Sequence, residues 1–121
     1  MNNPRPYESV LLPGDGVGVE VMSGARSVLE AALGRYGVDM RLTTIPCGGA
    51  YFLQHGRDWP EGAEDACSAA DVIILGSMGL PEPNRRGWPL MRPDGRMAGR
   101  SAVLGNRQRL EPASRPVAAS D

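Results

Sequence analysis

Lysine is absent from this sequence, and all 13 basic residues are arginine. None of the 121 residues can therefore act as a lysine Schiff base, a lysine general base or a lysine phosphate ligand. His55 is the only histidine, which excludes a metal site built from several histidines. Aromatic residues make up only 5% of the chain, so a hydrophobic core must be mainly aliphatic.

Cysteines and long apolar runs are also scarce. Cys47 and Cys67 fit neither a CxxC redox pair nor a secreted disulfide framework, so we interpret them as free, mostly buried thiols in a reducing compartment. The N-terminal residues have no apolar signal core, and the densest aliphatic run, Val72–Leu75, is far too short to span a bilayer. These absences predict a cytoplasmic protein that does not enter a membrane.

Charge is spread unevenly along the chain. Residues 1–83 contain 5 arginines and 11 acidic residues, whereas residues 84–121 contain 8 arginines and 3 acidic residues, which gives net charges of −6 and +5. Such a split can mark a site for an anionic ligand or a nucleic acid. The arginines are not interleaved with aromatic residues, which disfavours stacking on a single-stranded nucleic acid. A solvated arginine-rich loop is the simpler interpretation.

Short apolar runs alternate with helical patterns in the first two thirds of the chain. Runs at 9–12, 40–45 and 72–75 predict strands, and the segments between them predict helices at 19–33, 50–55 and 60–69. The order strand, helix, strand, helix, strand is typical of a parallel sheet. We therefore predict an α/β fold, namely a partial three-layer βαβαβ unit with a mostly parallel sheet.

Two of these segments carry more specific expectations. Residues 72–75 are apolar throughout, which predicts a strand buried on both faces. In the first helix, spacings of three and four residues predict a single buried apolar face. That face consists of Val21, Met22, Ala25, Val28, Leu29, Ala32 and Leu33.

The composition changes after Gly76. Prolines and glycines are frequent in residues 81–100 and disfavour regular structure there, whereas Ser101 can cap a last helix that Pro112 ends. We divide the chain into a flexible lead, a βαβαβ portion, a Pro/Gly/Arg loop, and a short helix with an irregular tail. Their ranges are 1–8, 9–80, 81–100 and 101–121.

A glycine-rich turn, Gly14-Asp15-Gly16-Val17-Gly18, separates the first strand from the first helix, where a phosphate cradle would lie. It is not a dinucleotide fingerprint, because Val19 occupies the position of the third glycine. It is not a P-loop either, because no lysine follows it. Its spacing alone favours an ordinary turn that needs left-handed backbone angles.

The wider string from Leu11 to Val21 resembles the opening signature of the isopropylmalate/isocitrate/tartrate dehydrogenase family. Val17 replaces the usual isoleucine of that signature, and Val19 replaces the usual proline. Further family-like blocks follow in the right order, so we identify residues 9–81 as resembling the amino-terminal part of this family. These blocks are Ser27-Val28-Leu29-Glu30-Ala31, Pro46-Cys47-Gly48-Gly49-Ala50, Gly56-Arg57-Asp58-Trp59-Pro60 and the strand from Ala70 to Pro81.

The resemblance implies oxidative decarboxylation of a 2-hydroxy acid, with NAD or NADP as hydride acceptor and Mg²⁺ or Mn²⁺ stabilising the enolate. The family's proton-transferring tyrosine and lysine and its metal-binding aspartates match no position in this chain. We therefore expect a truncated member, inactive alone, with no catalytic or metal-binding residue and no cofactor or metal bound by this chain alone. The particular 2-hydroxy acid stays open, as does the choice between NAD and NADP.

The resemblance also implies ligand-contacting positions. Arginines of the family clamp substrate carboxylates, and a guanidinium suits this role because it donates two parallel hydrogen bonds. The matching residues are Arg107 and Arg115 for the substrate, and Val17, Gly76, Ser77 and Gly79 for the cofactor. A solvent-exposed arginine without a ligand remains the alternative for Arg107 and Arg115. The acidic residues Asp15, Asp58, Asp65 and Asp71 are better interpreted as turn and helix-end residues.

Two other functions remain open. The chain could be a non-catalytic interaction module that pairs with a full-length paralogue, or with a second copy of itself, by completing its sheet. Without further strands, residues 72–75 would form an exposed edge that invites association, and the chain would be marginally stable alone. Binding of an anion or a nucleic acid by the basic half ranks last. The ligand that the resemblance implies is a small carboxylate.

Overall fold

The computed structural model describes residues 5–110, and its strands form one parallel sheet in the order β2-β1-β3. The predicted α/β fold with a parallel sheet is therefore confirmed. In chain order the elements are β1 (Tyr7–Leu12), α1 (Val17–Tyr36), β2 (Met40–Thr44), α2 (Gly49–His55), α3 (Ala63–Ala69), β3 (Val72–Leu75), the π-helical turn η1 (Ser101–Gly105) and α4 (Asn106–Leu110).

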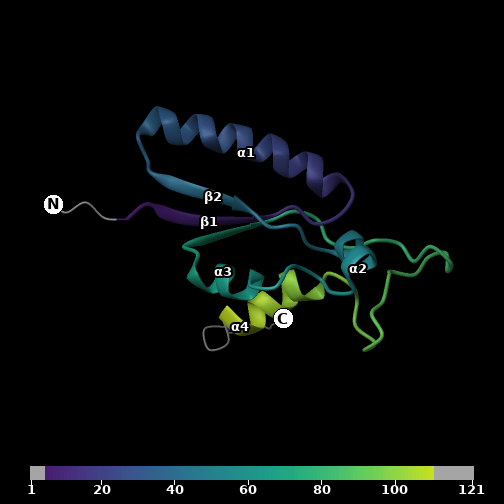
Figure 1. Ribbon diagram of the computed structural model, residues 1–121. Coiled ribbons are helices and arrows are strands. Elements are labelled where there is room, and N and C mark those ends of the chain that lie inside the picture. The colour runs from purple at the N-terminus through teal and green to yellow at the C-terminus, as the bar shows by residue number, and fades with distance from the viewer. Residues whose placement is uncertain (1–4, 111–121) are drawn as a thin grey trace, which may run out of the picture.

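The elements are arranged in three layers. Figure 1 shows α1 along one face of the sheet, α3 and α4 along the other face, and α2 beyond the ends of the strands. The chain leaves β1 toward α1 and reaches β3 from the opposite layer, so the connections diverge between these two strands. In open α/β sheets, such a divergence at the carboxyl ends of the strands is where ligands usually bind.

The main core lies between the sheet and the layer of α3 and η1. Val10 and Leu12 of the central strand point into it, together with buried residues of the loops and helices below. Those residues are Ile45, Cys47, Trp59, Ala63, Cys67 and Ala102. The central position of β1 explains why its apolar run is the buried one, since neighbouring strands cover both of its edges.

The prediction of a fully buried β3 is wrong, because Val72 and Leu75 are 42% and 43% exposed. β3 lies at one edge of the described sheet, so no neighbouring strand covers its outer side there. The apolar face of α1 is likewise only partly covered. Met22 is buried, whereas Val21, Ala25 and Val28 are exposed.

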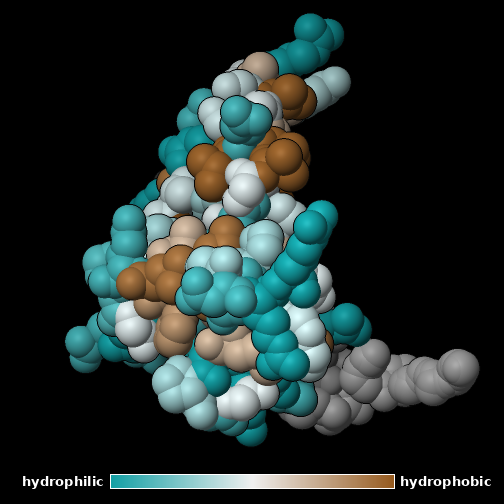
Figure 2. Space-filling view, turned by 90° about the vertical axis from the view of Figure 1, so that its right-hand side faces the viewer, coloured by the Kyte–Doolittle hydropathy of each residue, from teal (hydrophilic) through white to brown (hydrophobic). Residues whose placement is uncertain are grey.

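The incomplete cover of α1 has a geometric cause. At 1.5 Å per residue the 20 residues of α1 extend about 30 Å, whereas the six residues of β1 extend only about 20 Å. A sheet of three short strands cannot shield such a helix along its whole length. Figure 2 accordingly shows hydrophobic side chains on the surface at the height of α1.

The start of α3 differs from the sequence prediction for a local reason. The helix predicted from residue 60 begins at Ala63, because Gly62 adopts a left-handed conformation with φ of 91°. In 81–100, the strand-like contacts are two isolated antiparallel bridges, Pro81 with Pro89 and Met91 with Met97. In the described part of the chain, no helix combines the length and apolar character needed to cross a membrane.

Gly14 offers a direct test of this packing. Its φ is 79°, and a Cβ atom there would lie 2.0 Å from the carbonyl oxygen of Ser77. We predict that Gly14→Ala lowers the free energy of unfolding by about 2 kcal/mol or more, through backbone strain and overpacking. The matched control is Gly24→Ala within α1, where a Cβ meets nothing within 4 Å, and it should raise stability by about 0.5–1 kcal/mol. Urea unfolding measures both, and equal effects would contradict the packing described here.

Candidate functional site

The loops that follow β1 and β3 meet the start of α2 at the side chain of Asp15. This side chain is buried, and its carboxylate accepts hydrogen bonds from the backbone amides of Gly49 at 2.8 Å, Ala50 at 2.9 Å and Gly79 at 2.9 Å. Gly49 and Ala50 open α2, so the carboxylate satisfies amides that a helix start leaves without a partner. Asp15 therefore joins three segments at the carboxyl edge of the sheet.

Backbone contacts reinforce this junction. The amide of Asp15 donates to the carbonyl of Ser77 at 2.7 Å, and the Ser77 hydroxyl donates to the carbonyl of Asp15 at 3.1 Å. A Cβ atom on Gly18 or Gly76 would lie 2.2 Å or 2.1 Å from the carbonyl oxygen of Pro13. The glycines of the turn thus allow two loops to pack backbone against backbone, as the ordinary-turn interpretation of the sequence requires.

The structure brings the predicted cofactor-contacting positions to one edge. Val17 is the first residue of α1 and is 66% exposed, and Ser77 is exposed beside the same turn. Gly79 has open space around its Cα, since a Cβ there would meet nothing within 4 Å. Together with Gly76 these residues border the surface around Asp15, and their contact with a cofactor stays a prediction.

Arg107 lies exposed on α4 and borders a small groove of about 160 Å³ between this helix and β3. Leu75 lines the same groove and directly precedes Gly76, so the arginine is close to the carboxyl end of β3. Its role toward a substrate stays a prediction. Arg115 lies outside the described residues.

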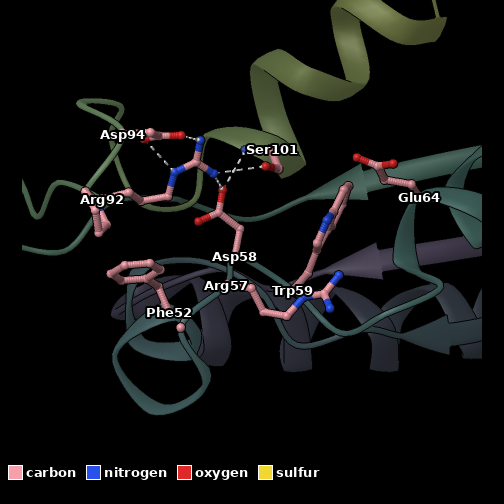
Figure 3. A pocket seen from close by; sticks show the side chains of 10 residues that line it. Phe52, Arg57, Asp58, Trp59, Glu64, Arg92, Asp94 and Ser101 are labelled. Atoms are coloured by element: carbon pink, nitrogen blue, oxygen red, sulfur yellow. Dashed lines mark hydrogen bonds and ion pairs between the residues drawn. The ribbon is translucent and has the colours of Figure 1, made fainter.

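A second buried carboxylate was interpreted from the sequence only as a turn residue. The Asp58 side chain, 1% exposed, accepts hydrogen bonds from the amides of Gly99 at 2.9 Å and Ser101 at 3.0 Å, and forms an ion pair with Arg92 at 2.7 Å. Arg92 also pairs with Asp94 at 2.7 Å. Figure 3 shows these groups converging around the Arg92 guanidinium.

Sequence reasoning missed Arg92, although a local signal was present. Arg92-Pro93-Asp94-Gly95 is a β-turn sequence, and the amide of Gly95 does donate to the carbonyl of Arg92 at 3.0 Å. That turn fixes the Arg92 backbone and places Asp94 beside its side chain. The pairing with Asp58, 34 positions earlier, has no sequence signature because it depends on the tertiary fold.

The Asp58 and Arg92 pair forms one wall of a pocket of about 420 Å³, the size of many ligand sites. Phe52, Arg57, Trp59 and Glu64 line other parts of it (Figure 3). Hydrogen bonding from Arg92 holds the pKa of Asp94 below its ordinary value. The hydrogen bond to Asp94 is also the main cause that raises the pKa of Arg92.

We tested whether a divalent metal fits this part of the protein. Within residues 5–110, no cluster of three or more His, Cys, Asp or Glu side chains is arranged to hold a metal ion. The two buried aspartates already use their oxygens to accept from backbone amides and from Arg92. The described residues therefore offer no ligand set for the metal ion that the resemblance implies for the family, whereas the exposed edge around Val17 and Gly79 leaves room for part of a cofactor.

The fold is thus an α/β fold with a parallel sheet, in which ligands usually bind at the carboxyl edge, where the glycine turn lies. The family model for isocitrate/isopropylmalate dehydrogenase matches residues 9–93. The chain is 42% identical over 83 residues to the 3-isopropylmalate dehydrogenase of Staphylococcus haemolyticus. This alignment covers 66% of this chain and 24% of that protein. It is 34% identical over 107 residues to the enzyme of Shigella sonnei, covering 88% of this chain and 28% of that protein.

A solved structure gives the same result. The beta-decarboxylating dehydrogenase of Thermococcus kodakarensis, in its apo form, superposes with a TM-score of 0.62 at 28% identity, over 86% of this chain and 26% of that one. The chain belongs to the isocitrate/isopropylmalate dehydrogenase family, and the resemblance seen in its sequence is confirmed. It spans about a quarter of the length of these relatives. The relatives are named as dehydrogenases, and the solved neighbour as a beta-decarboxylating one.

Both cysteines are free and buried, as the sequence predicted. Burial raises the pKa of the Cys47 thiol from 9.0 to about 11 and also raises that of Cys67. We predict that iodoacetamide at pH 8 modifies neither cysteine in the folded protein but modifies both in guanidinium chloride, as mass spectrometry would show. Rapid labelling of the folded protein would contradict this burial.

The raised pKa of Cys47 also predicts how stability depends on pH. Since the unfolded Cys47 thiol ionises near pH 9.0 and the folded one does not, the free energy of unfolding should fall from pH 9.0 upward.

Proposed function

We propose that this chain is a portion of an oxidative decarboxylase of 2-hydroxy acids, of the isopropylmalate/isocitrate/tartrate class, that uses NAD or NADP and Mg²⁺ or Mn²⁺. The observation that carries the proposal is the junction at Asp15. It gathers the family's glycine turn, its Gly-Gly-Ala turn and its Gly-Ser-x-Gly loop at the carboxyl edge of one parallel sheet. In this proposal residues 9–80 are the scaffold, and the helix after residue 100 carries the substrate-binding arginine.

The cofactor side of the proposal depends on Val17, Gly76, Ser77 and Gly79. An exposed aliphatic side chain next to open glycine backbone suits the flat face of a nicotinamide ring, because nothing there obstructs close approach. When bound, the cofactor would accept the hydride. The chain's own residues only bind and orient it.

The substrate side depends on Arg107, with Arg115 as its partner by family resemblance. Arg107 is exposed at the border of an otherwise mainly apolar groove, so its guanidinium is available to a carboxylate. The apolar wall of Ile73, Leu75 and Val103 would exclude water on the other side of the guanidinium.

We further propose that these 121 residues do not catalyse the reaction alone and do not retain the cofactor or the metal alone. The sequence has no lysine to move a proton, and the described residues provide no metal cluster. The prediction is that the purified chain forms no NADH or NADPH with isopropylmalate, isocitrate or tartrate, with Mg²⁺ or Mn²⁺ and either cofactor. Absorbance at 340 nm measures this, with a full-length 3-isopropylmalate dehydrogenase as the positive control. Reduced cofactor formed by the purified chain would contradict the proposal.

A second candidate function is a non-catalytic module that pairs with a full-length paralogue or with another copy of itself. The specific observation is the contrast between the two edges of the described sheet. β2 carries Arg41, which pairs with Glu8 at 3.0 Å, and two threonines, whereas β3 consists only of aliphatic residues. Charged and polar edge residues discourage strand pairing, and β3 lacks them.

Mixing with the full-length 3-isopropylmalate dehydrogenase of Staphylococcus haemolyticus tests this second candidate. If the module function holds, the chain elutes with the enzyme in size-exclusion chromatography, and Leu75→Lys at the β3 edge abolishes the complex. The matched control, Val28→Lys, alters a residue that is 71% exposed on α1 and should leave the complex intact. Independent elution of a monomeric chain would rule the module out.

A further inference from the structure

Two regions of the candidate site lie in different layers of the fold and need a rigid connection. The cofactor-side loops are fixed by Asp15, whereas Arg107 lies on α4, which follows a loop without helices or strands in 81–99. A guanidinium can orient a substrate only if the helix that carries it begins at a fixed place. The structure contains one buried charged group at that place, Asp58.

Asp58 contacts both the Gly-Gly-Ala turn at Gly48–Ala50, called the Gly48 turn below, and the beginning of the last helix. Its backbone carbonyl accepts from the amide of Gly48 at 2.9 Å, next to the Gly49 amide that Asp15 binds. Its side chain accepts from Gly99 and Ser101, the residues that flank the start of the helical segment. The backbones touch as well, since a Cβ on Gly99 would lie 3.3 Å from the Cα of Gly48.

Arg92 connects the Asp58 carboxylate to the loop before the last helix. It donates to the Asp58 carboxylate at 2.7 Å and to the hydroxyl of Ser101 at 3.3 Å, and its own side chain is only 16% exposed. The positive guanidinium balances the buried negative charge, which would otherwise be costly in the interior. Together the two side chains hold the loop at residue 92, and the helix start at residue 101, against the Gly48 turn.

From the helix start the constraint reaches Arg107 through a short continuous helix. The side-chain amide of Asn106 donates to the carbonyl of Ala102 at 3.1 Å, and η1 continues into α4 without a break. A second attachment joins α4 to α3, where Asn106 contacts the sulfur of Cys67 at 3.6 Å and Arg109 lies 3.9 Å from Glu64. Loss of the Asp58 attachment would leave the helix held at α3 alone and able to pivot.

We propose that Asp58 and Arg92 are positioning residues, which fix the start of the η1–α4 helix and thereby the place at which Arg107 meets a substrate carboxylate. The substrate part of this statement rests on the function proposed above. The positioning part stands on the contacts of Asp58 alone. The two parts therefore make separate predictions that one set of variants can distinguish.

The first measurement is amide hydrogen exchange by NMR on the 121-residue chain without ligand. Asp58→Asn should accelerate exchange of Gly99, Ser101 and the η1 amides by about tenfold or more, because charge-assisted hydrogen bonds are lost, while β1 keeps its protection. The matched control is Asp94→Asn, which removes the other, exposed partner of Arg92 and should change these rates less than about twofold, as exposed ion pairs contribute little. Arg92→Lys keeps the positive charge, so its exchange rates should lie between those of Asp58→Asn and Asp94→Asn.

The second measurement titrates malate, a small 2-hydroxy dicarboxylate, and follows the Arg107 side-chain NH signal together with the backbone amide signals of α4, which remain observable in Arg107→Ala. Arg107→Ala should abolish saturable binding, and Asp58→Asn should raise the Kd about fivefold or more, since one bidentate contact is misplaced. Arg35→Ala, another exposed arginine in the last turn of a helix, should leave the Kd unchanged.

The outcomes separate the two proposals. Unchanged exchange at Gly99 and Ser101 in Asp58→Asn overturns the positioning role, as does an unchanged Kd in a variant whose exchange has accelerated. A wild-type chain that malate never perturbs at Arg107 overturns the substrate role of that arginine, and the exchange rates still decide the positioning role. If Asp58→Asn does not fold, Arg92→Lys provides both measurements with the carboxylate retained.

Discussion

The fold depends on one buried carboxylate, that of Asp15, to hold three loops at the end of the sheet. Burying a negative charge is unfavourable unless hydrogen-bond donors surround it, and here backbone amides of Gly49, Ala50 and Gly79 do so. These donors lie 34, 35 and 64 positions after Asp15 in the chain. The glycines around them follow from this constraint, since side chains at Gly14, Gly18 or Gly48 would collide with the loops or with the carboxylate itself.

Asp58 is a second buried carboxylate that accepts from backbone amides, on the side of the sheet that faces α3 and α4. It too accepts from the amides at the start of a helical segment, but it also needs Arg92, which lies in an irregular loop. The Gly48 turn is common to both aspartates, because Asp58 binds its amide and Asp15 binds the next one. The cofactor side and the substrate side of the proposed site are thus connected through Asp15, the Gly48 turn and Asp58, whose backbone carbonyl contacts the turn and whose carboxylate contacts the start of the last helix.

The sequence predicted the sheet well because each strand carries its own signal. The run at 9–12 is apolar and lies between a polar lead and Pro13, and Val72–Leu75 matches its predicted range. The helix bounds were less predictable where a single glycine changes the backbone, as Gly62 does before α3. The resemblance to a known family predicted cofactor contacts at Val17, Gly76, Ser77 and Gly79, and these residues lie at one edge because they follow the ends of the parallel strands β1 and β3. Their contact with a cofactor stays a prediction.

Burial and long-range charge pairing could not be obtained in the same way. Periodicity identifies an apolar face on α1 but does not say how much sheet lies beneath it, so Val28 was wrongly expected to be buried. Arg92 and Asp58 are each ordinary in sequence, one in a proline turn and the other before a tryptophan. Only the fold places them 2.7 Å apart.

These features support the proposal that this portion of the family's fold does not catalyse the reaction by itself. The carboxylates of Asp15 and Asp58 already accept hydrogen bonds from several backbone amides, so few of their lone pairs remain for a metal ion. The exposed side chains at the proposed site are those of Arg107, Val17 and Ser77, and of these the arginine suits an anion because its guanidinium offers several hydrogen-bond donors. Within residues 5–110, the buried acidic side chains nearest the proposed site already take part in structural hydrogen bonds, so the proposed chemistry would need reactive groups from residues outside this range.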